Sequence, residues 1–152
     1  KSFKPLEWVC NSIFLNFKIY DDFTVVDSKL FFEKSKLSKN GNILLNGNNL
    51  NTLKFKIIYI FKTKINKVEK LNPNSDYLVI KVPTDCVKLI IKSAVKLNPK
   101  INTSLEGFYE SNHMFCTQCE PEGFRKITWF TDRPDNLSIF TVRIEAKNSY
   151  NN

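Results

Sequence analysis

The residues that could do chemistry gather between positions 102 and 135. This stretch holds the only histidine of the chain, His113, and a cysteine pair, Cys116 and Cys119, with the spacing CxxC. A structural zinc ion needs four ligands, usually from a second such pair, so a lone CxxC is weak evidence for a metal site and favours free thiols. A single histidine with no paired nucleophile likewise gives no catalytic centre. We predict no metal-binding and no catalytic residue in this chain.

Two further polar residues accompany the cysteine pair. Gln118 lies within it and Glu120 follows it, directly before Pro121. By residue type alone, the two side chains are most simply part of a solvated turn. Without the residues that flank them, this is the interpretation that we favour.

Three motifs follow one another around these residues. They are Asn-Thr-Ser-Leu-Glu-Gly at 102–107, Cys-Thr-Gln-Cys-Glu-Pro-Glu-Gly-Phe-Arg at 116–125 and Asp-Arg-Pro-Asp at 132–135. In this order and at this spacing they resemble the end of the amino-terminal domain of the aminopeptidase N family, in the alanyl-aminopeptidase branch of the gluzincin zinc peptidases. Looser similarity extends the resemblance over the whole chain, at 4–9, 45–50 and 96–99.

The resemblance implies a saddle of β-sheets that contributes to the substrate pocket of an enzyme removing single residues from the free amino terminus of peptides. It assigns Glu120 to the α-ammonium group of the peptide and Gln118 to the neighbourhood of the amine and the first side chain. It also implies a cis peptide bond between Glu120 and Pro121. Two departures limit the match, because Pro121 replaces the usual Ala and Trp129 replaces a common Tyr.

The catalytic signature of these enzymes, HExxH on a helix, is missing from this chain. Two histidines one helical turn apart and a carboxylate give three zinc ligands with one open position, and one histidine cannot supply that site. The resemblance therefore implies that zinc is held by a catalytic domain of the same polypeptide, which we expect after Asn152. Because the chain starts at Lys1 without a methionine or a leader pattern, we expect a fragment of such a protein.

Alternation of apolar and polar residues predicts strands over most of the chain. Two of these strands, 12–20 and 24–33, are joined by the Asp21-Asp22 turn into an antiparallel hairpin. Further strands are predicted at 43–45, 53–61, 78–82, 87–95 and 140–144, with polar loops at 35–42 and 62–75. We therefore predict an all-β fold, an antiparallel curved sheet or sandwich of saddle-like shape, with at most one short helix near 123–130.

Length and composition favour one folded domain. The 152 residues can bury a core, and 42% hydrophobic residues with 13% aromatic residues argue against disorder. Apolar runs stay far below the roughly 20 residues of a membrane span, so we predict no membrane partner. We predict a single β domain at 1–147, with 148–152 as a frayed tail or the start of the linker to the catalytic domain.

Charge and cysteine content bear on partners and location. The net charge of +8 would suit nucleic acid, but the lysines are scattered through nearly every segment, which favours solvated strand faces. We therefore predict no nucleic-acid partner. The four cysteines lack the spacing of a secreted disulfide framework, and we expect a reducing, cytoplasmic location. The glycosylation triplets at Asn102 and Asn136 arise readily in an asparagine-rich chain.

Two other functions stay open from the sequence. The domain could be a stand-alone β binding module that remains from an aminopeptidase, or a basic nucleic-acid-binding domain. Under the leading interpretation, we expect Phe108, Phe115, Trp129 and Phe130 to serve in packing, partly against the catalytic domain, since large exposed apolar patches seldom stay solvated.

Overall fold

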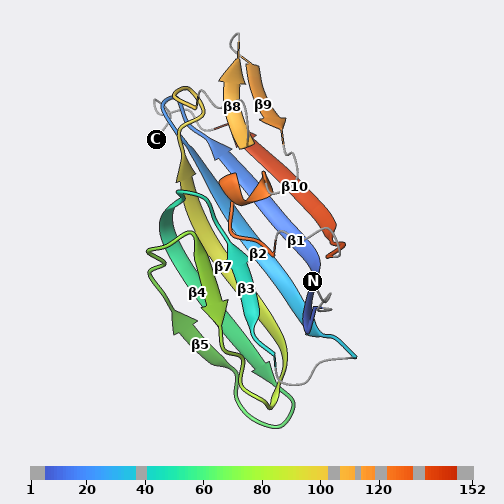
Figure 1. Cartoon of the computed structure of the whole chain (residues 1–152). Helices are drawn as coiled ribbons and strands as arrows, with labels where there is room; N and C mark the ends of the chain where they lie inside the picture. Colours follow the sequence, from blue (N-terminus) through green and yellow to red (C-terminus); the bar gives the residue numbers. More distant parts are fainter. Residues whose placement is uncertain are drawn as a thin grey trace, which may run out of the picture.

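A six-stranded sheet forms the body of the computed structural model (Figure 1), which describes residues 6–36, 41–102, 107–111, 114–118, 123–131 and 136–146. The strand order is β10-β1-β2-β7-β4-β5. Neighbouring strands are antiparallel except for β1 and β10, which run parallel. The strands are β1 Trp8–Ile19, β2 Thr24–Lys34, β4 Asn51–Phe61, β5 Lys67–Lys70, β7 Cys86–Leu97 and β10 Ile139–Ala146.

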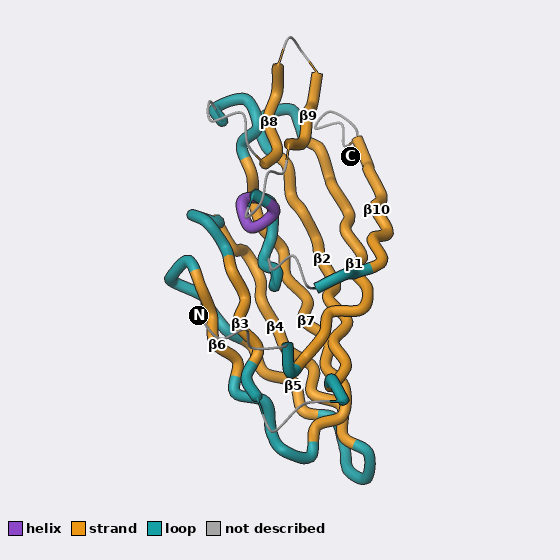
Figure 2. Tube along the Cα trace, turned by 45° about the vertical axis from the view of Figure 1, so that its right-hand side comes forward, coloured by secondary structure: helices purple, strands orange, loops and turns teal. Residues whose placement is uncertain are grey.

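A smaller second layer covers one face of this sheet. It contains an antiparallel pair, β3 Ile43–Asn46 and β6 Tyr77–Ile80, and a single 3₁₀ turn, η1 Phe124–Lys126. Figure 1 shows β3 and η1 in front of the sheet. A hairpin of β8 Gly107–Ser111 and β9 Met114–Gln118 extends from one end of the molecule, as the tube in Figure 2 shows. Within the described residues, no helix has the length and apolar character needed to span a bilayer.

The core lies between the two layers and follows from the period of two along each strand. In β2, Val26, Ser28, Leu30 and Phe32 are buried, whereas the odd-numbered residues between them point to the other face of the sheet. Leu45 of β3 and Trp129 close the core from the second layer. Because the long strands bury mainly alternate side chains, the sheet has one covered face and one open face.

A buried polar chain crosses the same interface. The Ser28 and Ser93 hydroxyls, on neighbouring strands, lie 2.9 Å apart, and Thr128 donates to Ser28 across the layers at 3.3 Å. All three side chains are buried. Because these hydroxyls bond to one another, they avoid the penalty of unpaired polar groups in a core.

The all-β class and the hairpin of β1 and β2 predicted from the sequence are confirmed. The strands at 43–45, 53–61, 78–82, 87–95 and 140–144 also occur, with boundaries shifted by a few residues. Two elements escaped prediction. One is β5, which lies inside the predicted loop at 62–75, and the other is the β8–β9 hairpin. The boundary of the domain at residue 147 stays a prediction, because residues 147–152 lie outside the described part.

The helix predicted near 123–130 shrinks to the single turn η1. Gly123, the residue directly before η1, has no side chain that could cap the start of a helix. No local hydrogen bond therefore favours further helical turns. Downstream, Phe130 forms an isolated antiparallel bridge with Asn46, with backbone distances of 2.8 and 3.1 Å between nitrogen and oxygen. Pairing with β3 requires extended backbone and therefore ends the helical spacing.

The parallel pairing of β10 is the departure from an antiparallel sheet. It places Phe140, Val142 and Ile144 beside Ile13, Leu15 and Phe17 of β1, in the same order along both strands. A parallel strand needs a long connection rather than a tight turn, and sequence alternation alone does not specify its direction.

Asn136 fixes the entry to β10. Its side chain accepts a hydrogen bond from the Cys10 backbone nitrogen at 2.9 Å and donates to the Cys10 carbonyl at 3.3 Å, so the amide imitates a neighbouring strand. The contact lies at the irregularity of β1 between Cys10 and Ser12. Because Asn136 is buried with its amide nitrogen engaged, a glycan there is incompatible with this packing.

We expect Asn136→Ala to lower the free energy of unfolding by about 1–3 kcal/mol, because the buried backbone groups of Cys10 would lose their partner. Urea denaturation of the purified chain measures the effect. The matched control is Asn74→Ala, at an exposed position in the turn before β6. Equal stability of the two variants would show that Asn136 does not hold β10 in place.

Candidate functional site

The β8–β9 hairpin carries the first of the two predicted substrate-binding residues. Gln118 is the last residue of β9 and pairs with Gly107, the first residue of β8. Gly107 has a φ of 74°, and a Cβ atom there would lie 3.1 Å from Cβ of Lys126. Glycine is therefore required at the base of the hairpin, both for its backbone conformation and for its close approach to η1.

The second predicted residue lies outside the described part of the chain. Residues 119–122 include Glu120 and Pro121, so the cis bond between them and the position of the Glu120 carboxylate stay predictions. The segment is bounded by described residues on both sides, Gln118 at the end of β9 and the buried Gly123 before η1.

Stacked phenylalanine rings attach the hairpin to the sheet. Phe108 of β8 stacks on Phe17 of β1, with ring centroids 5.4 Å apart, and on Phe115 of β9 at 5.6 Å. The backbone adds a hydrogen bond from Glu110 to the Pro99 carbonyl at 3.0 Å. These contacts hold the strand that ends in Gln118 against the end of β1.

Trp129 attaches the chain that follows residues 119–122 to the sheet. Its indole nitrogen donates to the Thr52 hydroxyl at 2.9 Å, and its ring meets Phe55 edge-on at a centroid distance of 6.1 Å. A Cβ atom on Gly47 would approach this ring to 3.0 Å, so the β3–β4 connection lies directly against it. The interpretation of Trp129 as a packing residue is confirmed. The Tyr that is common at this position would place a hydroxyl group here in place of the indole nitrogen.

The exposed apolar surface differs from the one expected. Phe108, Trp129 and Phe130 are buried within this chain, and among the four predicted residues only Phe115 is exposed, at 43%. The larger exposed surface lies on β10, where the exposed fractions are 47% for Phe140, 53% for Val142 and 68% for Ile144. We call Phe115, Phe140, Val142 and Ile144 the apolar edge.

The apolar edge continues the core face of the sheet. Ile144 lies beside Phe17, which joins it to Phe115 through the stacked ring of Phe108. Phe140 still contacts Phe124 and Phe130 edge-on, whereas Val142 and Ile144, further along β10, are more exposed. The alternation of apolar and polar residues in β10 predicted that its apolar face would be covered. That face is exposed because β10 lies at the edge of the sheet.

The cysteines show no metal site in the described chain. No three His, Cys, Asp or Glu residues among the described positions lie close enough together to hold a metal ion. Cys10 and Cys86 are buried free thiols, and Cys116 is a half-buried free thiol. The described residues therefore do not fit a zinc ion, and any zinc chemistry has to come from outside them.

Comparisons with known proteins place this framework in a family. The Peptidase M1 N-terminal domain family matches residues 10–151. Aminopeptidase N of Caulobacter vibrioides is 32% identical over 148 residues, which is 97% of this chain and 16% of that protein. Aminopeptidase N of Escherichia coli is 49% identical over 59 residues, which is 39% of this chain and 7% of that protein.

A solved structure shares the fold. The crystal structure of Legionella pneumophila aminopeptidase A in complex with aspartic acid matches 93% of this chain with a TM-score of 0.73 and 21% identity. The matched region is 16% of that protein chain. The chain thus spans only about a sixth of the length of these relatives.

We expect the thiols of the folded chain to differ sharply in reactivity. Burial raises the pKa of Cys10 to about 11 and also raises the pKa of Cys86 above its ordinary value. The thiolate is the reactive form, so a raised pKa reduces the reactive fraction at pH 8. Iodoacetamide at pH 8 should therefore alkylate Cys116 first, and Cys10 and Cys86 only after unfolding.

Peptide mass spectrometry at timed intervals measures this order. A Cys116→Ser, Cys119→Ser variant serves as the control, because the folded protein should then be almost inert until denaturant is added. Modification of Cys10 at the rate of Cys116 in the folded chain would contradict the buried position of β1.

Proposed function

Because the chain belongs to the Peptidase M1 N-terminal domain family, we propose that it is the amino-terminal, non-catalytic part of a zinc aminopeptidase. The complete enzyme removes single residues from the free amino terminus of peptides. The observation that carries the proposal is the match to aminopeptidase N of Caulobacter vibrioides along 97% of this chain. Zinc would be held by a catalytic domain of the same polypeptide and would supply Lewis-acid chemistry there.

In this enzyme, Glu120 binds the α-ammonium group of the peptide substrate and Gln118 lies beside it. A carboxylate and an ammonium group form a charge-assisted hydrogen bond, which is strong where water is excluded. An enzyme that cleaves inside a peptide has no use for such a contact, because no amino terminus lies at its scissile bond. Glu120 therefore fixes the position of the amino terminus relative to the bond that is cleaved.

The framework around residues 119–122 supports this role. The hairpin is fixed to β1 by the Phe17, Phe108 and Phe115 stack, and η1 is fixed by the hydrogen bond from the Asn48 backbone to the Arg125 carbonyl at 2.9 Å. Substrate-binding groups act best when rigid elements hold their neighbours in place. Both ends of the segment that carries Glu120 meet this condition.

The apolar edge is the surface on which the catalytic domain of the same polypeptide packs. Val142 and Ile144 extend the core face of the sheet without cover from the second layer. Contiguous exposed apolar surface of this kind marks an interaction site. Phe115 belongs to both the edge and the hairpin, so the same contact would bring the catalytic domain close to Gln118.

The free cysteines support a cytoplasmic location for this enzyme. Cys10, Cys86 and Cys116 are free, and reducing compartments maintain free thiols.

In the complete enzyme, we expect Glu120→Ala to raise KM and to lower kcat/KM by an amount equivalent to about 2–5 kcal/mol, because the substrate ammonium loses its counter-charge. Steady-state kinetics on alanine 4-nitroanilide measure the loss. The control is Asp85→Ala, which removes an exposed carboxylate that pairs with Lys64 at 2.6 Å far from the hairpin. Unchanged kinetics in Glu120→Ala would reduce Glu120 to a turn residue.

We expect the isolated 152-residue chain to self-associate, because the apolar edge is then exposed to water. Val142→Ser with Ile144→Ser should shift the chain toward the monomer in sedimentation velocity and weaken the binding of a dye specific for apolar surface. The matched control, Ile65→Ser with Ile101→Ser, changes two residues that are 92% and 74% exposed outside the edge. A monomeric parent chain that binds no dye would argue against a docking role.

A further inference from the structure

The open face of the six-stranded sheet carries four lysines in one line across the strands. Lys29 of β2 pairs with Lys92 of β7, Lys92 with Lys56 of β4, and Lys56 with Lys70 of β5. Directly paired residues point to the same face, and neighbouring strands lie about 4.7–4.9 Å apart. We call these residues the lysine row. Lysines that are far apart in the sequence thus become direct neighbours.

The charge of the lysine row is not neutralised within the described chain. The nearby carboxylates are already engaged, Asp27 with Lys18 at 2.7 Å and Glu33 with Lys88 at 3.6 Å. No described acidic residue forms an ion pair with any lysine of the row. Like charges directly opposite one another destabilise a sheet, so the row has an energetic cost that a counter-charge would remove.

An apolar row runs parallel to the lysine row. Phe31 pairs with Ile90, Ile90 with Ile58, and Ile58 with Val68. These positions are two residues along each strand from the lysines, a separation of about 6.4–6.8 Å. Phe31 and Val68 are exposed, and Ile58 and Ile90 are half-buried. Solvated faces of antiparallel sheets are usually polar, so this line of apolar side chains is unusual.

The lysine row also borders a hollow in the open face. Its volume is about 730 Å³, and its lining includes Phe14, Asn16, Lys29, Lys56, Lys70 and Lys92. The two central lysines, Lys56 and Lys92, are half-buried, whereas Lys29 and Lys70 at the ends of the row are exposed. An anionic group there would form charge-assisted hydrogen bonds to neighbouring ammonium groups.

We propose that the lysine row and the apolar row together bind an acidic amphipathic helix of a separate protein. A helix laid across the strands advances 5.4 Å per turn, close to the spacing between strands, so carboxylates one turn apart would meet successive lysines. Its apolar stripe would cover Phe31, Ile58 and Ile90. A phosphate backbone would leave these apolar residues facing polar groups, which disfavours nucleic acid as the occupant.

A separate protein follows from the position of the two rows. They lie on the open face, whereas the apolar edge shares the face of Ile13, Leu15 and Phe17 on the other side of the sheet. A catalytic domain on the apolar edge would therefore leave the lysine row accessible. The assignment of the helix to a separate protein rests on the proposed function, but the binding of the helix is measured without any enzymatic activity.

The test uses a fluorescein-labelled 18-residue helical peptide with leucine at i, i+3, i+4 and i+7 and glutamate along one flank of that stripe. Fluorescence anisotropy with the 152-residue chain should show binding that weakens as salt is raised. Lys56→Gln with Lys92→Gln should weaken binding about tenfold. The same peptide with glutamine in place of glutamate should bind equally weakly to the parent chain and to this variant.

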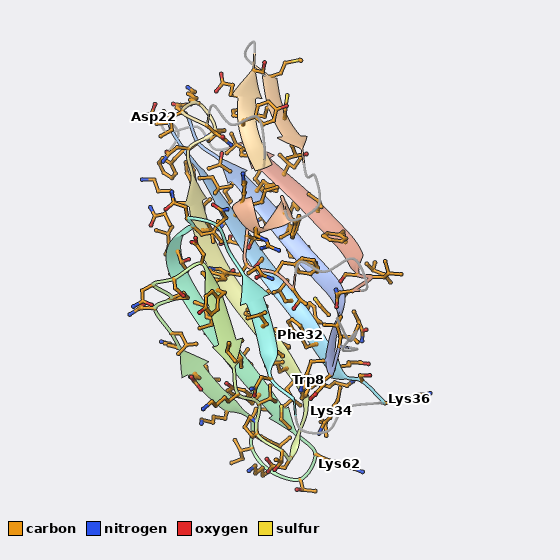
Figure 3. The ribbon with its side chains drawn as sticks, in the orientation of Figure 1. Trp8, Asp22, Phe32, Lys34, Lys36 and Lys62 are labelled. Carbon is orange, nitrogen blue, oxygen red and sulfur yellow. The ribbon has the colours of Figure 1, made fainter. Side chains whose placement is uncertain are left out.

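The matched control removes the same charge elsewhere. Lys36→Gln with Lys62→Gln changes two exposed lysines beyond the ends of β2 and β4, labelled in Figure 3, and should leave the affinity unchanged. Thermal melting checks the fold, and the lysine row variant should melt at or above the parent temperature because like-charge repulsion is relieved.

Three results would overturn the proposal. One is an equal loss of peptide affinity in the control variant, which would reveal a bulk charge effect. Another is unchanged affinity in the lysine row variant. The last is row-dependent binding of a 20-base-pair DNA duplex or of phosphatidylserine vesicles without binding of the peptide. None of these outcomes bears on Glu120, whose role is decided by the kinetics of the complete enzyme.

Discussion

The packing of Trp129 between the two layers is the contact on which the rest of the structure depends. Its ring fills the space between Phe55 of the sheet and Gly47 of the second layer, and its indole nitrogen is satisfied by Thr52. On one side of it, Phe130 bridges to Asn46, and on the other, Thr128 bonds to Ser28. These contacts hold the short segment after residue 122 between the layers and so fix one end of the candidate site.

The two faces of the sheet have different roles. The covered face supplies the core and, where the second layer ends, becomes the apolar edge beside the hairpin of Gln118. The open face carries charge that described partners do not neutralise, next to a line of apolar side chains. A domain built into a longer enzyme can thus present one surface to its own polypeptide and another to a different protein, because a strand directs alternate residues to opposite sides.

Local rules predicted most strands and failed where a distant partner decides the conformation. Alternation found β1, β2, β4 and β7, which are long and half-buried. It missed β5, whose four residues are strand only because β4 offers a free edge. It also predicted a helix where Phe130 pairs with Asn46 instead. For the site, residue types alone favoured a solvated turn at Gln118 and Glu120, and only the resemblance to a family assigned them a role, which kinetics have to test.

The sequence by itself determined the all-β class, the absence of an HExxH zinc signature from this chain and the motifs that point to its family. These properties depend only on residue types and on short spacings along the chain. Only the tertiary structure decided that β10 pairs in parallel at an edge with its apolar residues uncovered, and that lysines scattered along the sequence line up in one row. The physical reason is register. Which residues of two strands face each other depends on the pairing of segments far apart in the chain. A slip of one strand by one residue would turn its lysine to the other face and break the row.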